Sequence, residues 1–205
     1  MRLLPCGRHG LLVEVARLDD VLDLYAALLE QTPPGVVDMV PAARTVMLHV
    51  DPAVTNLAKV ERAVRAIKPS RAARADEPLV EIPVVYDGED LADVGALTGW
   101  GVEGVIERHT SAPWTVAFCG FAPGFAYLAS SEHGWSIPRR MSPRVRVPAG
   151  AVALGDEFTG VYPRESPGGW QLIGHAQVPK FDLDRDPPAL LMPGCRVHFV
   201  DVGRG

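Results

Sequence analysis

Lysine is scarce in this 205-residue chain, and the common nucleotide and metal signatures are missing. Lys59, Lys68 and Lys180 are the only lysines, and no G-x-x-x-x-G-K-S/T motif occurs, which excludes a P-loop. The six histidines are scattered without H-E-x-x-H or paired spacing, so we predict no metal site. A G-x-S-x-G nucleophile elbow is also missing. Among the basic side chains, we therefore expect arginine rather than lysine at any site for an anion.

Cysteine and long apolar runs are equally limited. Cys6, Cys119 and Cys195 form no C-x-x-C pair, as expected of reduced thiols. No stretch reaches the roughly 18 uninterrupted apolar residues of a membrane span, and the first residues lack the apolar run of a signal peptide. We therefore predict a cytoplasmic protein with no membrane partner.

The charge is weakly negative and unevenly distributed. The formal net charge of −5 argues against a general nucleic-acid binder, which usually presents a basic face. Residues 76–107 hold nine acidic residues and no Lys or Arg, whereas residues 139–146 carry four arginines and no acid. The average therefore conceals two opposed patches.

Hydrophobic residues make up 47% of the chain, enough for a substantial core, and their pattern predicts an α+β fold in two domains. Residues 1–78 are expected to form a ferredoxin-like domain in the order β-α-β-β-α-β after a short extra strand. Its helices are expected over 21–31, capped by Asp19 or Asp20, and over 54–67, and a strand over 79–86 closes the order. Residues 69–78 are expected to form a connecting loop.

Residues 79–205 predict a cyclophilin-like β-barrel. Two short helices are expected over 91–97 and 102–108, followed by short strands separated by frequent Gly and Pro. The apolar runs expected to form these strands are Thr115–Cys119, Val145–Val147, Ala151–Leu154, Gln171–Ile173 and Val197–Val202. The G-x-G-x-x-G match at Gly99–Gly104 follows a predicted helix instead of a strand, so we interpret it as one helix ending and another beginning.

Three segments of the second domain could form a site, although each also has a purely structural interpretation. Residues 120–128 read GFAPGFAYL, which suits either a fixed loop beside a ligand or an aromatic corner of a barrel. The arginines of residues 138–148 could bind a carboxylate or phosphate, or could be solvated or paired. Ser166–Gln171 could direct backbone N–H groups at an anion, or could be a tight turn.

The ordered set of these motifs resembles the 5-oxoprolinase B-subunit (PxpB) family, also called the KipI or allophanate hydrolase subunit 1 family. The resemblance covers nearly the whole chain, with departures at Ala151, His175-Ala176 and Cys195. The segments that carry it are Thr32–Val36, Gly120–Leu128, Pro138-Arg139, Pro143-Arg144, Val147–Gly150, Thr159–Pro163, Ser166–Gly174, Phe181-Asp182 and Pro193-Gly194.

The resemblance implies one component of an enzyme that opens 5-oxoproline to L-glutamate with ATP as co-substrate. It implies a KipA-like C-subunit as partner and in some cases a LamB/YcsF-like A-subunit. Two alternatives stay open: a KipI-like inhibitor of a histidine kinase or other regulatory binding module, and a subunit related to allophanate hydrolase or urea carboxylase. No ATP motif is visible in this chain, so we expect the nucleotide site largely outside it.

For the substrate, the hypothesis is that Arg144 or Arg139 binds the carboxylate and the Gly168 and Gly169 amides face the lactam carbonyl. His109 and His175 are candidate general bases, although neither has a motif to support it. The full set of expected substrate-binding residues is Tyr127, Arg139, Arg144, Arg146, Ser166, Gly168, Gly169, Trp170 and Gln171.

Overall fold

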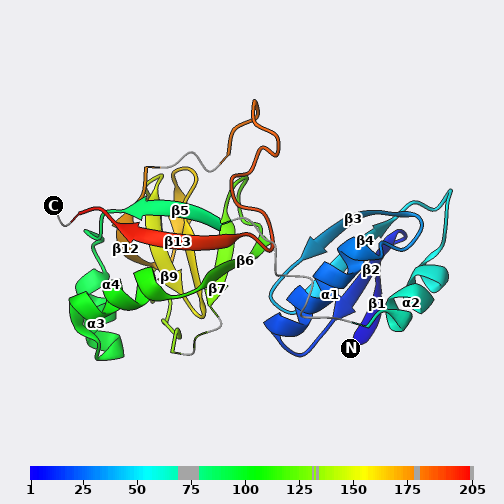
Figure 1. Cartoon of the computed structure of the whole chain (residues 1–205), viewed down its shortest axis with the longest axis horizontal. Helices are drawn as coiled ribbons and strands as arrows, with labels where there is room; N and C mark the ends of the chain where they lie inside the picture. The colour runs from blue at the N-terminus through cyan, green and yellow to red at the C-terminus, as the bar shows by residue number, and fades with distance from the viewer. Residues whose placement is uncertain (69–78, 131, 133, 178–180, 204–205) are drawn as a thin grey trace. The chain divides into compact units, whose positions relative to one another are not determined.

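The computed structural model describes residues 1–68, 79–130, 132, 134–177 and 181–203. The chain divides into two compact units, Met1–Glu77 and Pro78–Gly205, and each is described by itself below (Figure 1). The expected connecting loop over 69–78 lies outside the described residues.

The first unit is an antiparallel four-stranded sheet with two helices. In strand order the sheet runs β1-β2-β4-β3, and alternate residues of β4 (Val46, Leu48 and Val50) are buried, as the two-residue period of a strand requires. Val60 and Val64, one helical turn apart, bring the second helix to the same core. The elements are β1 (Arg2–Cys6), β2 (Gly10–Glu14), α1 (Leu18–Glu30), β3 (Val36–Pro41), β4 (Thr45–Val50) and α2 (Leu57–Ala66).

Three details of this unit differ from the sequence prediction. Helix α2 begins at Leu57, three residues later than expected, because Asn56 is its N-cap and its side chain accepts the Lys59 backbone N–H at 3.0 Å. Helix α1 begins at Leu18, three residues earlier than expected, because Arg17 is its N-cap and Asp20 accepts the Arg17 backbone N–H from inside the first turn. The strand predicted to close this sheet is absent from it: Leu79–Val84 joins the second unit, and β1 occupies the edge beside β2. The ferredoxin-like class of this unit therefore stays a prediction.

The second unit is built on a seven-stranded, barrel-like sheet in the order β12-β9-β10-β7-β6-β13-β5. Val85 and His175 exchange two backbone hydrogen bonds of 2.9 Å and so join the two edges of the sheet at one point. The predicted barrel is thus present and nearly closed. Its sheet strands are β5 (Leu79–Val84), β6 (Trp114–Cys119), β7 (Ala126–Ser130), β9 (Ala151–Gly155), β10 (Phe158–Val161), β12 (Gln171–His175) and β13 (Arg196–Asp201).

Helices α3 (Leu91–Thr98) and α4 (Gly101–Ser111) pack against β12 and β13 (Figure 1). Gly99 ends α3 in the left-handed conformation (φ 72°) and Gly101 starts α4, so the G-x-G-x-x-G segment is a helix end and a helix start, as predicted. Strands β7 and β10 were not predicted, because their few apolar residues stand among glycines and aromatics.

A short segment seals the remaining gap between the sheet edges. Gly88 lies against the β12 backbone so closely that a Cβ would stand 2.4 Å from the Leu172 carbonyl oxygen. The next residues lead into α3, and the Asp90 N–H donates to the same carbonyl at 2.9 Å. The chain between β5 and α3 therefore runs along the free edge of β12.

Candidate functional site

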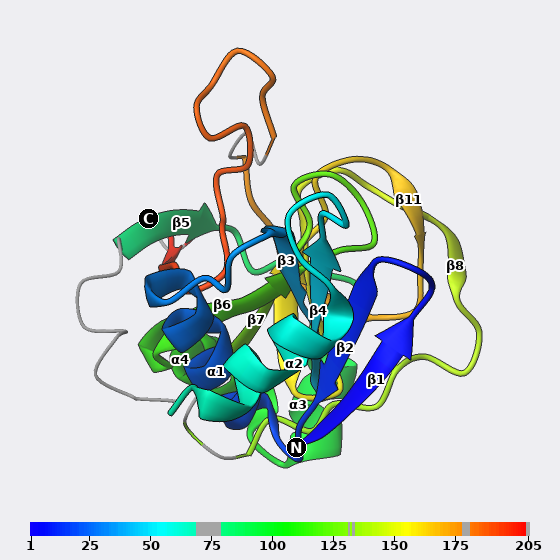
Figure 2. The same cartoon turned by 90° about the vertical axis from the view of Figure 1, so that its right-hand side faces the viewer.

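A separate pair of strands stands beside the barrel sheet and carries two of the predicted motifs (Figure 2). Strand β8 (Arg144–Val147) pairs with β11 (Ser166–Gly168), and Gly168 lies opposite Arg144. We call this pair, with the preceding loop over 138–143, the arginine arm. The loop is fastened to the motif after β11 because the Arg140 N–H donates to the Gly169 carbonyl at 2.7 Å.

Five aromatic rings next to the arm form one cluster, named here the aromatic cluster: Phe121, Phe125, Tyr127, Tyr162 and Trp170. The Phe125 ring is central, with its centroid 5.0 to 5.6 Å from those of the other four. All four pairs meet edge to face, the arrangement that aromatic quadrupoles favour. Residues 120–128 are thus both an aromatic corner and a candidate binding wall.

Glycine makes this packing possible at two places. The Trp170 indole lies directly on Gly155, where a Cβ would stand 2.6 Å from the ring. Similarly, the Tyr162 hydroxyl would lie 2.3 Å from a Cβ at Gly168. Gly169 is different, since its nearest neighbour, Pro143, would be 3.8 Å from a Cβ. Gly168 is therefore required by the packing of Tyr162, whereas Gly169 has space.

Phe121 is the exposed member of the cluster, with 58% of its surface accessible. Its backbone has φ 66°, a left-handed conformation that is a genuine outlier for a bulky residue. Strain of this kind costs about 1–3 kcal/mol and concentrates at functional sites. An exposed aromatic ring on strained backbone makes this loop a candidate binding element.

The four arginines of the arm are all paired with carboxylates, as in the structural alternative considered for this run. Arg139 donates to Asp156 at 2.8 Å and Arg146 to Glu165 at 2.6 Å, and both pairs are exposed. Arg140 and Arg144 share the Asp90 carboxylate at 2.5 and 2.8 Å. A further contact joins Arg144 to Glu89 at 3.1 Å.

The two kinds of pair differ in what they leave for a ligand. The Arg139 pair is open to water, and exposed ion pairs exchange partners at little cost. Arg144 is held more firmly, because its side chain is 15% exposed and that of Asp90 is 3% exposed. Burial by itself raises the pKa of Asp90, but hydrogen bonds from Arg144 and the Leu172 amide outweigh it and hold that pKa below its usual value.

The remaining residues predicted for substrate binding fall into two groups. Tyr127 is part of the aromatic cluster, where burial raises its pKa and nearby Arg139 partly opposes that shift, so the phenol is a neutral donor. Gln171 is buried and donates to the Pro138 carbonyl at 3.0 Å, which anchors the start of the arm. Ser166 and Arg146 lie on the arm, but their side chains bond to Arg164 and Glu165 at its exposed side.

His109 lies in the barrel core, away from any surface. Its ring nitrogens contact the Tyr86 hydroxyl at 2.7 Å and the Thr159 hydroxyl at 2.9 Å. Thr159 donates its single hydroxyl hydrogen to the Ala153 carbonyl, so it accepts from Nε2–H of His109, and Nδ1 accepts from Tyr86. Burial lowers the pKa of His109 to about 3, and the imidazole is neutral without a free lone pair.

His175 lies at the end of β12 where the barrel edges meet. Its Nδ1 is 2.8 Å from the Asp87 carboxylate, and its side chain is partly exposed. In its strand it is four residues from Gln171, the residue that anchors the arm. Within the described residues, the side-chain hydrogen bonds of both histidines are therefore made to residues outside the arm and the aromatic cluster.

The arginine arm and the aromatic cluster can bind, but they offer little reactive chemistry. Among the described residues around them, no solvent-accessible hydroxyl or thiol is hydrogen-bonded to a histidine or carboxylate. No group of three or more potential metal ligands occurs within the part of the chain that the structure describes. A flat, anionic ligand is the chemistry that paired guanidinium groups beside aromatic rings favour.

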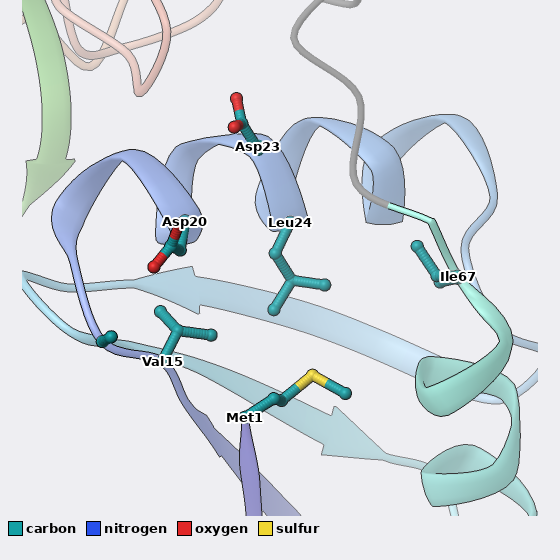
Figure 3. A pocket seen from close by; sticks show the side chains of 7 residues that line it. Met1, Val15, Asp20, Asp23, Leu24 and Ile67 are labelled. Atoms are coloured by element: carbon teal, nitrogen blue, oxygen red, sulfur yellow. The ribbon is translucent and has the colours of Figure 1, made fainter.

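The structure has further hollows at other places. One of about 350 Å³ adjoins the arm and is lined by residues 135–138 with Asp156 and Glu157. Another, of about 340 Å³, lies in the first unit, where Leu24 points inward toward Val15 and Met1 while the Asp23 carboxylate points away (Figure 3).

No helix in the described residues is long and apolar enough to cross a membrane.

Several residues of this region were not among the sequence candidates. Asp90 and Glu89 lie 50 or more positions before the arginines that they bind, so no local pattern connects them. Phe121 and Phe125 stand in a quoted motif, and the spacing of two Phe between Gly and Pro was the available signal. Tyr162 stands in the segment Thr159–Pro163, which was noted for the resemblance, but its contact with Gly168 is visible only in the structure.

Comparison with known proteins gives this arrangement a class. The family description "Carboxyltransferase domain, subdomain C and D" matches residues 1–191, and the chain belongs to that family. The fold agrees, since the Kluyveromyces lactis urea carboxylase matches with a TM-score of 0.73 at 18% identity over 98% of this chain and 21% of its own.

More similar proteins have a more specific name. The B-subunit of 5-oxoprolinase from Escherichia coli O157:H7 is 45% identical over 84% of this chain and 81% of its own length. That of Bacillus subtilis (strain 168) is 34% identical over 91% of this chain and 84% of its own. The crystal structure of TTHA0988 is 38% identical with a TM-score of 0.78, and the match covers 95% of this chain but 40% of that longer chain.

Proposed function

We propose that the chain is the B-subunit of an ATP-dependent 5-oxoprolinase, which converts 5-oxoproline, ATP and water to L-glutamate, ADP and phosphate. The observation that carries this proposal is the identity of 34–45% with proteins named as the B-subunit of 5-oxoprolinase over most of both chains. The site chemistry is compatible, because 5-oxoproline is a small, flat ring with one carboxylate and one lactam carbonyl.

In the proposed complex, this chain binds the substrate and its partners complete the reaction. The Arg139 or Arg144 guanidinium takes the carboxylate, and the Gly168 and Gly169 amides face the lactam oxygen. Tyr127 and Trp170 form the apolar wall beside the ring. Phosphoryl transfer from ATP to the lactam oxygen releases ADP. One water molecule then adds to the activated carbon and the C–N bond breaks, which leaves the free amine and an acyl phosphate. A second water molecule hydrolyses the acyl phosphate to the glutamate carboxylate and inorganic phosphate.

The lack of an evident base among the described residues near the aromatic cluster supports activity only in a complex. A lactam is too stable for easy hydrolysis without activation, and this chain has no recognisable nucleotide motif. We therefore propose a KipA-like C-subunit as partner and, in some assemblies, a LamB/YcsF-like A-subunit. The TTHA0988 match supports a larger working unit, because there the corresponding region is part of a chain more than twice as long.

The lack of an evident base near the aromatic cluster, in the part of the chain that the structure describes, also favours one alternative, a KipI-like regulatory module that binds without catalysis. The two functions are separated by assaying ATP-dependent release of glutamate from 5-oxoproline with the chain alone and with its candidate partners. Activity that appears only with partners supports the role in the enzyme. No activity in any combination, together with inhibition of a histidine kinase by the chain alone, would establish the alternative.

One variant, compared with a matched control, tests Arg139 in an active complex. Arg139→Ala is expected to raise KM for 5-oxoproline by about tenfold, the effect of losing one charge-assisted hydrogen bond. Arg65→Ala removes an equally exposed ion pair from the first unit, that with Glu61 at 2.7 Å, and serves as the matched control. Equal kinetics for the two variants would remove Arg139 from the proposed site.

A further inference from the structure

Asp90 occupies a helix N-cap but does not use its side chain as a cap. It precedes α3 directly, the position where aspartate normally accepts a hydrogen bond from the first helical turn. The structure has no such side-chain bond at this cap. The carboxylate is turned away from its own helix, so another requirement has determined its orientation.

That orientation connects the barrel edge with the arginine arm. The Oδ2 atom accepts the Leu172 N–H of β12 at 2.7 Å, and the Oδ1 atom accepts from Arg140 at 2.5 Å and from Arg144 at 2.8 Å. The residue is 2% exposed. One buried carboxylate thus holds two arginines of the arm against a strand of the barrel.

The geometry requires an ionised carboxylate at this point. Both of its oxygens act as acceptors, and two of its three donors carry positive charge. An amide of the same shape would place an NH₂ group against a donor and leave the guanidinium groups without a counter-charge. Asparagine at position 90 therefore changes the arm while it conserves the volume of the side chain.

The two arginines retain donors that no described residue accepts. Nε of Arg140 and Nη1 of Arg144 are both buried and have no hydrogen-bond partner within the described residues. Buried donors without partners are rare in folded proteins and need an explanation. Here the same two side chains belong to the arm beside the aromatic cluster, where a carboxylate or phosphate oxygen would satisfy them.

We propose that Asp90 is a positioning residue, which holds Arg140 and Arg144 so that their remaining N–H groups meet an oxygen of an anionic substrate. The inference rests on the proposed function, and it adds Arg140 and Asp90 to the site. The acidic residue acts through the arginines and does not touch the substrate. We assign this oxygen to the 5-oxoproline carboxylate. A phosphate oxygen of ATP has the same hydrogen-bonding chemistry, and the experiment below distinguishes the two.

The test compares Asp90→Asn with wild type in the complex assembled with its partner subunits. We expect KM for 5-oxoproline to rise by about tenfold or more, because a charge-assisted contact is lost, while kcat changes less and KM for ATP is constant. If KM for ATP rises and KM for 5-oxoproline does not, the oxygen bound by Arg140 and Arg144 belongs to a phosphate of ATP. A merely structural role would reduce the amount of folded complex without moving either KM.

The matched control is Glu61→Gln, which removes a carboxylate from an exposed arginine pair in the first unit. Values of both KM within twofold of wild type in an assembled Asp90→Asn complex would overturn the inference. If that variant does not fold, Arg140→Gln replaces it, since it leaves Asp90 paired with Arg144 and Leu172, and a smaller rise in KM for 5-oxoproline is expected.

An inactive wild-type complex would reject the proposed function without deciding the role of Asp90. Hydrogen exchange on the full-length chain then decides that role. Asp90→Asn should accelerate exchange over residues 138–147 and at Leu172, whereas Glu61→Gln should not. Equal exchange in the two variants would show that the carboxylate does not position the arm.

Discussion

Mild acid should destabilise the second unit through His109, whose imidazole is neutral and wholly buried. Nδ1 can take a proton only if the Tyr86 hydrogen bond breaks, because that hydroxyl already donates to it. The new charge would then lie among Trp114, Trp135 and Phe199, whose rings surround the imidazole. The unfolded chain has no such restriction, so protons stabilise it relative to the folded state.

The size of the effect follows from the difference between the two pKa values. The pKa is about 3 in the folded chain, against an ordinary value of 6.5. Since the folded value is the lower one, the full stability is present above 6.5 and is lost as the pH falls. At pH 5 the loss is roughly 2 kcal/mol, which is about 1.5 pH units at about 1.36 kcal/mol each. The carboxyl of Asp90 titrates below this range, because its pKa is held below its usual value.

Urea unfolding between pH 7 and pH 5, followed by tryptophan fluorescence, measures this loss. All four tryptophans lie in the second unit, so the signal reports that unit alone. His109→Gln should be less stable at pH 7 by about 1–3 kcal/mol, the cost of imperfect buried hydrogen bonds, but should lose much less on acidification. His198→Gln, at a partly exposed position, is the control. Parallel losses in wild type and His109→Gln would refute the argument.

Three further predictions concern the site. Phe121→Gly should leave the fold as stable or more stable by about 1 kcal/mol, because it removes backbone strain, yet raise KM in the active complex. Gly168→Ala should destabilise the unit by about 1–3 kcal/mol in urea unfolding, since a phenol occupies the space of its Cβ, and Gly169→Ala should be tolerated. Arg144→Ala should cost about 3–5 kcal/mol because it breaks a buried ion pair, and an equal effect of Arg146→Ala would contradict this difference between buried and exposed pairs.

Local patterns predicted much of the fold. The helices around residues 91 and 102 could be placed because Gly99 and Gly101 separate two apolar runs, and β9 because Ala151–Leu154 is wholly apolar. The partner of β5 could not be predicted. It pairs in parallel with β13, more than 110 residues later, and nothing in the alternation of a strand specifies which strand lies beside it.

The candidate site shows more clearly that local sequence patterns do not predict contacts between distant residues. A run of arginines without nearby acids stood out in the sequence, and a free anion site was a reasonable interpretation. The barrel brings residues 89 and 90 to that run, so the two opposed charge patches partly neutralise each other. The buried carboxylate and the donors left over after that pairing distinguish Arg140 and Arg144 from Arg139 and Arg146.

The parallel pairing of β5 with β13 has a mechanical consequence. Six residue pairs, from Leu79 with Arg196 to Val84 with Asp201, join the strand that enters the barrel unit to the one that leaves it. Tension applied through the chain before β5 and after β13 pulls these strands at opposite ends. The force is then in shear and is shared by the whole ladder at once, instead of opening it one bond at a time. The barrel unit is thereby built to resist stretching along the chain.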